Sequence, residues 1–410
     1  MDGDARRRLP YQNQKKPPDS MTGLCKSLFL NDWRERARAG APDSAWSRWM
    51  ATHVGGCATR TTKTPPASMT GLCKSLSLND WRERARAFEQ QLSRVVIGQE
   101  RVIRLLTIAI FARGHVLLEG DVGVGKTTLL RAAARVLGGP YQRVEGTIDL
   151  MPGDLLYHAS IGDDGRPRMD PGPVLQQGPD LVIFFFNEIN RARPQVHSLL
   201  LRLMAERSVT AFNKEYSFPY LQLFADRNRI EREETFELPA AARDRFFMEI
   251  LVETPQDREV RRELLFNQRF HDVDALVASV PADLIDYRGI GAAAEAIQNN
   301  VHSSPTLQDY VLSLWQAVRY PGASGIELDG IDMDRLVQGG ASPRGMSYLV
   351  QAARVRAWLE ERDMIVPEDI RDVFVETIGH RIFLDAIYEL RRDQIVRDLC
   401  RTAFDQVAVP

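Results

Sequence analysis

The chain has 410 residues, enough for two or three domains with a large core, and a formal net charge of −2. That balance excludes a global polyanion-binding surface, and the four cysteines form no C-x-x-C pair, which suits a reducing cytoplasm. No apolar run approaches the length of about 20 residues that a membrane span needs, so we expect no membrane span.

The N-terminal segment contains a duplication, because residues 15–39 and 63–87 have nearly identical sequences. Two copies do not make a repeat array, which needs about three stacking units, so we expect residues 1–67 to be a disordered or duplicated extension. The second copy alone continues into a helical pattern, with Ser77 and Asp80 as a capping box. Its apolar positions at helical spacing are Trp81, Ala85, Phe88, Leu92 and Val95.

A phosphate loop, G-x-x-x-x-G-K-[ST], follows a turn and a short amphipathic helix at 101–111. An apolar strand at 115–119 precedes the loop, and a helix at 128–137 follows it, which argues against a glycine-rich turn that matches by chance. Lys126 can reach the β- and γ-phosphates of ATP, and Thr127 can offer its hydroxyl to Mg²⁺. In front of such a loop, Gly98 and Gln99 lie where many ring ATPases hold adenine. The other predicted contacts are Gly120, Asp121, Val122, Gly123, Val124, Gly125 and Thr128.

A buried strand at 181–186 ends in two polar residues, Asn187 and Glu188. We expect this strand to lie parallel and next to the phosphate-loop strand, which would put both side chains beside the phosphates, where Glu188 can polarise the attacking water. Hydrolases of this class usually carry Asp at the position of Asn187, where it helps to hold Mg²⁺ and its waters. An amide can accept a hydrogen bond from such a water but adds no charge, which leaves Mg²⁺ affinity and rate open.

Three further segments carry candidate site residues. A strand at 221–227 ends at Asn228, which could orient the same water or simply form a strand-end turn. Arg243 and Arg245 follow, and either could be an arginine finger for a neighbouring subunit or a surface ion pair. Between the helix and the Glu188 strand, hydrophobic flanks around a turn at 162–165 predict a β-hairpin, which from these residues alone is a plain surface feature. A contact for partners at this hairpin is implied only by the family resemblance given below.

After residue 255 the pattern becomes helical, with Gly and Pro in the gaps. The pattern predicts four helices, at 259–266, 307–320, 346–361 and 367–376. Together they indicate a small helical bundle. Arg344 lies just before the third helix, where it could reach over to the γ-phosphate.

From Gly98 onward the chain resembles the MoxR family of AAA+ ATPases, over roughly residues 88–410. The resemblance depends on E-I-N-R-A at 188–192, on the run from L-P at 238–239 to D-R-F at 244–246, and on G-A-S-P-R at 340–344. It implies a P-loop AAA+ α/β core at 68–255, with a parallel sheet flanked by helices, and an all-α lid at 256–410.

The resemblance also implies roles for single residues. Lys126 and Thr127 would belong to Walker A, Glu188 would be the catalytic Walker B glutamate, and Asn228 would be sensor 1. Arg245 would be the arginine finger, with Arg243 as its competitor, and Arg344 would be sensor 2. The chain departs from the family at Asn187, and at Arg227 and Arg229, which flank the sensor 1 position.

The implied activity is ATP hydrolysis in a homo-oligomeric ring, expected to be a hexamer, that remodels or matures a protein complex or metalloenzyme. A protein client and a von Willebrand factor A-domain partner would go with it. One alternative is a nucleotide-gated protein-binding module with weak ATPase activity because of Asn187; another is the motor subunit of a metal chelatase. A nucleic-acid motor is disfavoured by the near-neutral charge.

Overall fold

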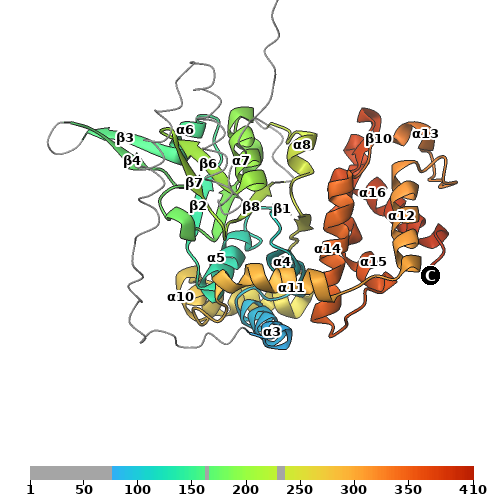
Figure 1. The fold of residues 1–410 in the computed structure, drawn as a ribbon, viewed down its shortest axis with the longest axis horizontal. Helices are drawn as coiled ribbons and strands as arrows, with labels where there is room; N and C mark the ends of the chain where they lie inside the picture. The colour runs from blue at the N-terminus through green and yellow to red at the C-terminus, as the bar shows by residue number, and fades with distance from the viewer. Residues whose placement is uncertain (1–75, 162–165, 229–235) are drawn as a thin grey trace, which may run out of the picture. The chain divides into compact units, whose positions relative to one another are not determined.

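The computed structural model describes residues 76–161, 166–228 and 236–410 (Figure 1). The predicted extension at 1–67 lies outside the described residues. Ser75–Pro410 form one compact unit, in which an α/β part is followed by a helical part. Among the described residues no helix is both long enough and apolar enough to cross a membrane.

The α/β part is built on a parallel five-stranded sheet with the order β2-β5-β8-β1-β9. The inner strands β1 and β5 are short, nearly continuous apolar runs, as expected when helices cover both faces. Because all strands run the same way, the carboxyl ends of β1, β5 and β8 meet at one edge. The bounds are β1 (Val116–Glu119), β2 (Tyr141–Glu145), β5 (Ile183–Asn187), β8 (Gln222–Arg227) and β9 (Met248–Leu251).

Two sets of helices cover the two faces of this sheet. Leu118 and Phe185 pack against α3 (Leu78–Val95), α4 (Glu100–Phe111) and α5 (Lys126–Leu137). Leu117 and Phe186 pack on the opposite face, against α6 (Pro152–Leu156), α7 (Pro194–Glu206) and α8 (Ala240–Arg243).

The predicted start of α3 is confirmed. Asp80 N donates to Ser77 Oγ at 3.2 Å, Ser77 N donates to Asp80 Oδ2 at 2.8 Å, and the five predicted apolar positions are buried. This reciprocal capping box satisfies two backbone donors that a helix N-terminus otherwise leaves free.

Two antiparallel hairpins are attached to the α/β part. The first, β3 (Tyr157–Ile161) with β4 (Pro167–Pro171), confirms the hairpin expected from the sequence, and Figure 1 shows it projecting away from the central sheet. The second pairs β6 (Ser208–Ala211) with β7 (Lys214–Ser217). At the tip of the first hairpin, Ile161 is 80% exposed.

The four helices predicted after residue 255 are present as α9 (Arg258–Phe266), α12 (Pro305–Arg319), α14 (Pro343–Leu359) and α15 (Pro367–Ile378). The predicted start of the third helix is wrong, because Ser342 caps α14 and Arg344 lies inside its first turn. The structure adds a short antiparallel pair, β10 (Val337–Gly339) with β11 (Phe383–Leu384), which is too short to show a period in the sequence. It also adds α10 (Val273–Ala278), α11 (Ile290–Asn300), α13 (Met333–Leu336) and α16 (Arg392–Gln406). Of these, α10 packs on α5, and α11 packs on α3 and α4. A lid boundary at 255/256 therefore remains a prediction.

Candidate nucleotide site

The phosphate loop joins the end of β1 to the start of α5, as predicted. Gly123 has φ 83° and Gly125 has φ 90°, a left-handed backbone that favours glycine. A Cβ atom on Gly120 would come within 2.2 Å of the Val252 carbonyl oxygen, so the backbone approach there also requires glycine. The loop therefore presents its amides and the N-terminus of α5 at one place, an arrangement that binds phosphate.

Lys126, the predicted phosphate-binding lysine, is buried and folded back. Its Nζ donates to the Gly120 carbonyl oxygen at 2.6 Å and lies 2.9 Å from Asp226 Oδ2. Asp226, which is on β8 and 2% exposed, was not predicted as a site residue. A phosphate group would have to draw the ammonium group away from this carboxylate.

At the end of β5, Asn187 and Glu188 lie at the same edge of the sheet as the phosphate loop. The expectation that their strand lies next to the phosphate-loop strand is wrong, because β8 is inserted between β5 and β1. Asn187 is buried, and its Nδ2 donates to Glu145 Oε1 on β2. Glu188 has φ 55°, a conformation that costs a non-glycine residue about 1–3 kcal/mol. Its amide donates to Asp226 Oδ1 at 2.5 Å, and its Oε2 lies 3.1 Å from Arg191 Nε. Several contacts thus hold the predicted catalytic carboxylate in a strained turn.

Asn228 follows β8 directly, one residue after Arg227. Arg227 Nη2 lies 3.2 Å from Glu119 Oε2 and 2.6 Å from Glu249 Oε1. Burial works to lower the pKa of Arg227, but the two carboxylates outweigh burial and raise that pKa. This ion cluster joins the last residues of β1 and β8, so it supports both the start of the phosphate loop and Asn228.

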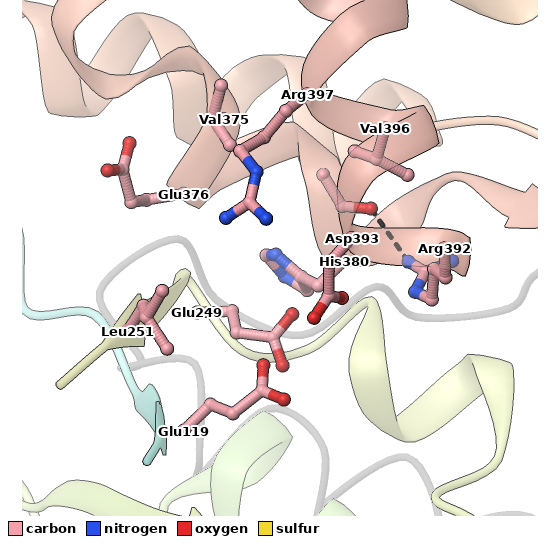
Figure 2. A pocket seen from close by; sticks show the side chains of 11 residues that line it. Glu119, Glu249, Leu251, Val375, Glu376, His380, Arg392, Asp393, Val396 and Arg397 are labelled. Carbon is pink, nitrogen blue, oxygen red and sulfur yellow. Dashed lines mark hydrogen bonds between the residues drawn. The ribbon is translucent and has the colours of Figure 1, made fainter. Parts of the chain in front are cut away.

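A cavity of about 180 Å³ lies beside the ion cluster (Figure 2). Glu119 and Glu249 border it from the sheet, and His380, Asp393 and Arg397 border it from the helical part. Neither Lys126 nor Thr127 lines it. This cavity is therefore part of the seam between the α/β and helical parts and is separate from the phosphate loop.

The two finger candidates differ in their surroundings. The Arg243 guanidinium lies over the Phe383 ring, 5.8 Å from its centroid, and burial lowers the pKa of Arg243. Arg245 Nη1 donates to the Ala241 carbonyl oxygen at 3.3 Å. Between them, Asp244 Oδ2 lies 3.3 Å from Arg344 Nη1. The structure thus brings Arg344, in the first turn of α14, next to the finger segment.

The predicted adenine side lies near the turn after β9. Gln99 is buried, and its Nε2 donates to the Glu253 carbonyl oxygen at 2.5 Å. Gly98, in the turn that precedes α4, has φ 71°, a backbone conformation that favours glycine. A cavity of about 250 Å³ opens here, lined by Gly120, Asp121, Leu251, Val252, Glu253, Thr254 and Gln256.

Comparisons with known proteins show the family of this chain. Residues 115–248 match the family model for the ATPase family associated with various cellular activities (AAA), and residues 332–399 match the AAA lid domain. Protein MoxR of Methylorubrum extorquens is 65% identical over 323 residues, covering 79% of this chain and 94% of that protein. The chain belongs to the MoxR family of AAA+ ATPases.

More distant relatives support the same assignment. Chaperone MoxR1 of Mycobacterium tuberculosis is 34% identical to this MoxR-family chain over 327 residues, covering 78% of this chain and 82% of that protein. A crystal structure of a protein from Cytophaga hutchinsonii, described as an ATPase, is 29% identical. It superposes with a TM-score of 0.70 and covers 81% of this chain and 97% of that chain.

The residues present fit ATP with Mg²⁺, the ligands that the family implies. Thr127, Asn187, Glu188 and Asp226 offer a hydroxyl, an amide and two carboxylates, and Mg²⁺ prefers such oxygen ligands. In the described part of the chain, no group of three or more His, Cys, Asp or Glu side chains could hold a metal by itself.

Sequence reasoning missed Asp226, Glu119 and Arg191. A carboxylate at Asp226, directly after the apolar run Leu223–Ala225 of the strand, was visible in the sequence and could have marked the residue. The partners of Glu119 are far apart in the chain, so no local pattern pointed to that residue.

Proposed function

We propose that this MoxR-family chain hydrolyses ATP with Mg²⁺ and couples the cycle to the remodelling of a protein client. The observation that carries the proposal is the convergence of Lys126, Glu188 and Asn228 at one edge of the parallel sheet. Membership of an ATPase family supports nucleotide binding at this edge.

The chain's own residues supply the chemistry of an in-line attack on the γ-phosphate. The Glu188 carboxylate accepts a hydrogen bond from the attacking water and orients it, and the Asn228 amide holds the same water. Lys126 exchanges its contact with Asp226 for the β- and γ-phosphate oxygens. Thr127 and Asn187 would hold Mg²⁺ and its waters, and the bound ion would supply positive charge against the charge that develops on the phosphates.

We assign Arg245 as the arginine finger that acts on a neighbouring subunit in a ring, with six subunits as the expected number. The Arg243 guanidinium lies over the Phe383 ring of its own chain, so Arg245 is the better candidate for the arginine finger. Arg344 shares Asp244 with this segment, so we expect it to act with Arg245 on the neighbour's nucleotide. A finger of this kind contributes about 10³–10⁵ in rate in other nucleotide hydrolases.

The remodelling part of the proposal rests on two observations. One relative is named a chaperone. The β3–β4 hairpin carries the exposed Ile161 and Met169 on a projecting element, and exposed apolar side chains of this kind suit contact with a client. A von Willebrand factor A-domain partner and a reducing cytoplasm remain the expectations from the sequence.

The steady-state ATPase rate of the full chain with Mg²⁺, measured beside Glu188→Gln, tests the proposal. We expect a rate at least about 100-fold above that of the variant, with nucleotide affinity unchanged, because Glu188 acts on the water and not on ground-state binding. If the two rates were equal while nucleotide still bound, the proposal that the chain hydrolyses ATP by itself would be rejected. A nucleotide-gated binding module, favoured by Asn187, would then replace it.

A further inference from the structure

Asp226 occupies a position in the site that no sequence pattern assigned to it. It is 2% exposed and connects two parts of the site through one carboxylate. Asp226 Oδ2 lies 2.9 Å from Lys126 Nζ, and Asp226 Oδ1 accepts a hydrogen bond of 2.5 Å from the Glu188 amide. A buried carboxylate in this place is therefore shared by the phosphate-binding lysine and the turn that presents Glu188.

Asn187 cannot provide the same charge. Its side chain is neutral, and its Nδ2 is bonded to Glu145 on β2, the strand on the far side from β8. The parallel register of β5 and β8 ends with Phe186 opposite Ala225, so Asn187 and Asp226 are the next residues on the two strands. The family usually has a carboxylate at the position of Asn187 on β5. Here the carboxylate lies on the neighbouring strand β8 instead, and neighbouring strands are about 4.8 Å apart.

We propose that Asp226 supplies the carboxylate of the magnesium–phosphate site that Asn187 lacks. Before nucleotide binds, Asp226 neutralises the buried Lys126. When the phosphates draw Lys126 away, the Asp226 oxygen released from that contact accepts a hydrogen bond from a water of the Mg²⁺ ion. This assignment rests on the proposed function, because it concerns the same nucleotide site.

Equilibrium binding of a fluorescent ATP analogue to the full chain tests the assignment, in Mg²⁺ and again in excess EDTA. The measured quantity is the ratio of Kd in EDTA to Kd in Mg²⁺. We expect a ratio of at least about tenfold for the unsubstituted chain, because residues that hold a metal's surroundings change its affinity by about 10–100-fold. In Asp226→Asn the ratio should fall to about threefold or less.

Two further variants sharpen the comparison. The exchange Asn187→Asp with Asp226→Asn returns the carboxylate to β5 and should restore the Mg²⁺ dependence. Asp369→Asn is the matched control, because it removes a fully buried carboxylate from α15 that pairs with Arg356 and Arg362 and not with Lys126. Its ratio should equal that of the unsubstituted chain. If Asp226→Asn does not fold, Asp226→Thr, a residue that suits a strand, removes the same charge and decides the question.

The contrary results are distinct. If the neutral variants at position 226 bind nucleotide more tightly in EDTA and keep the full Mg²⁺ dependence, then Asp226 only competes for Lys126, and the assignment is overturned. If the unsubstituted chain binds no nucleotide under either condition, then the proposed function fails and the assignment fails with it.

Discussion

At the scale of single residues, the site depends on how Glu188 is held. Its left-handed backbone is sustained by the amide contact to Asp226, and its carboxylate lies 3.1 Å from Arg191 Nε. Arg191 comes three residues later, in the short helical turn after β5. An ion pair across one turn selects one rotamer of a long side chain, so Arg191 should act as a positioning residue for the attacking water.

We expect Arg191→Met to lower kcat about tenfold while the Kd for ATP stays unchanged, because a misoriented base loses rate without losing ground-state binding. Steady-state kinetics and equilibrium nucleotide binding check this. Arg202→Met is the matched control, since Arg202 pairs with Glu206 on the exposed side of α7, and its kcat should not change. A parallel rise in Kd in Arg191→Met would mean that Arg191 supports folding of the site and does not orient Glu188.

At the scale of elements, Asp244 and Arg381 join the α/β part to the helical part. Arg381 is 1% exposed, and burial lowers its pKa to about 10 against the opposing effect of Asp244. Its Nε lies 3.3 Å from Asp244 Oδ1, and its Nη2 donates to the Asp244 carbonyl oxygen at 3.1 Å. Ser342 Oγ donates to the same carboxylate at 2.8 Å. Asp244 thus holds the start of α14 and the turn after α15 against the segment that leads into β9.

Asp244→Ala should lower the free energy of unfolding by about 3 kcal/mol, because it leaves Arg381 buried without its counter-charge. Urea unfolding measures this. Asp274→Ala removes an exposed partner of Arg131 and should cost less than about 1 kcal/mol. The double variant Asp244→Ala with Arg381→Met should recover part of the loss, since the buried charge is then removed and only the exposed charge of Arg344 loses a partner. If Asp244→Ala and Asp274→Ala lowered the free energy of unfolding equally, the argument from the buried ion pair would be contradicted.

At the scale of the whole molecule, the proposed finger from a neighbouring subunit would make the active unit a pair of chains. Glu188→Gln and Arg245→Ala should each be inactive alone. Mixed in equal amounts, they should regain about a quarter of the unsubstituted ATPase rate, because one site in four then combines an intact Glu188 with a neighbour's intact Arg245. No recovery after subunit exchange, confirmed by co-purification of two tags, would mean that Arg245 acts in its own chain.

The stability of the whole chain should depend on pH through His115. Burial lowers the pKa of His115 to about 3, and its Nδ1 accepts a hydrogen bond from the Leu223 amide at 2.9 Å. The unfolded chain takes up this proton near pH 6.5 and the folded chain only near pH 3, so stability is lost as pH falls below 6.5. We expect about 1.4 kcal/mol of loss per pH unit from this residue.

Urea unfolding between pH 5 and 7.5 measures that slope. His115→Asn keeps an acceptor for the Leu223 amide but cannot take up the proton, so its slope should be smaller by one proton. Burial also lowers the pKa values of His197 and His380, so a residual slope should remain in the variant. A variant slope equal to that of the unsubstituted chain would contradict the assignment to His115.

Local patterns in the sequence determined much of the fold. The capping box at Ser77, the glycine pattern of the phosphate loop and the four helices after residue 255 each follow from residues within one turn or one short segment. The parallel sheet, and the placement of Glu188 and Asn228 beside the loop, followed from apolar strands that end in polar residues. Short elements such as α13 and β11 span too few residues to show a period.

Only the tertiary structure decided which charges meet. Lys126 and Asp226 lie on different elements, Arg381 reaches Asp244 across 137 positions, and Arg227 joins Glu119 to Glu249. The energy of an ion pair depends on distance and burial, and neither can be read from a linear sequence. The sequence alone therefore determined the class of the site, from a loop and two strand ends. The position of its carboxylate, one strand away from Asn187, was decided by the register of β5 against β8.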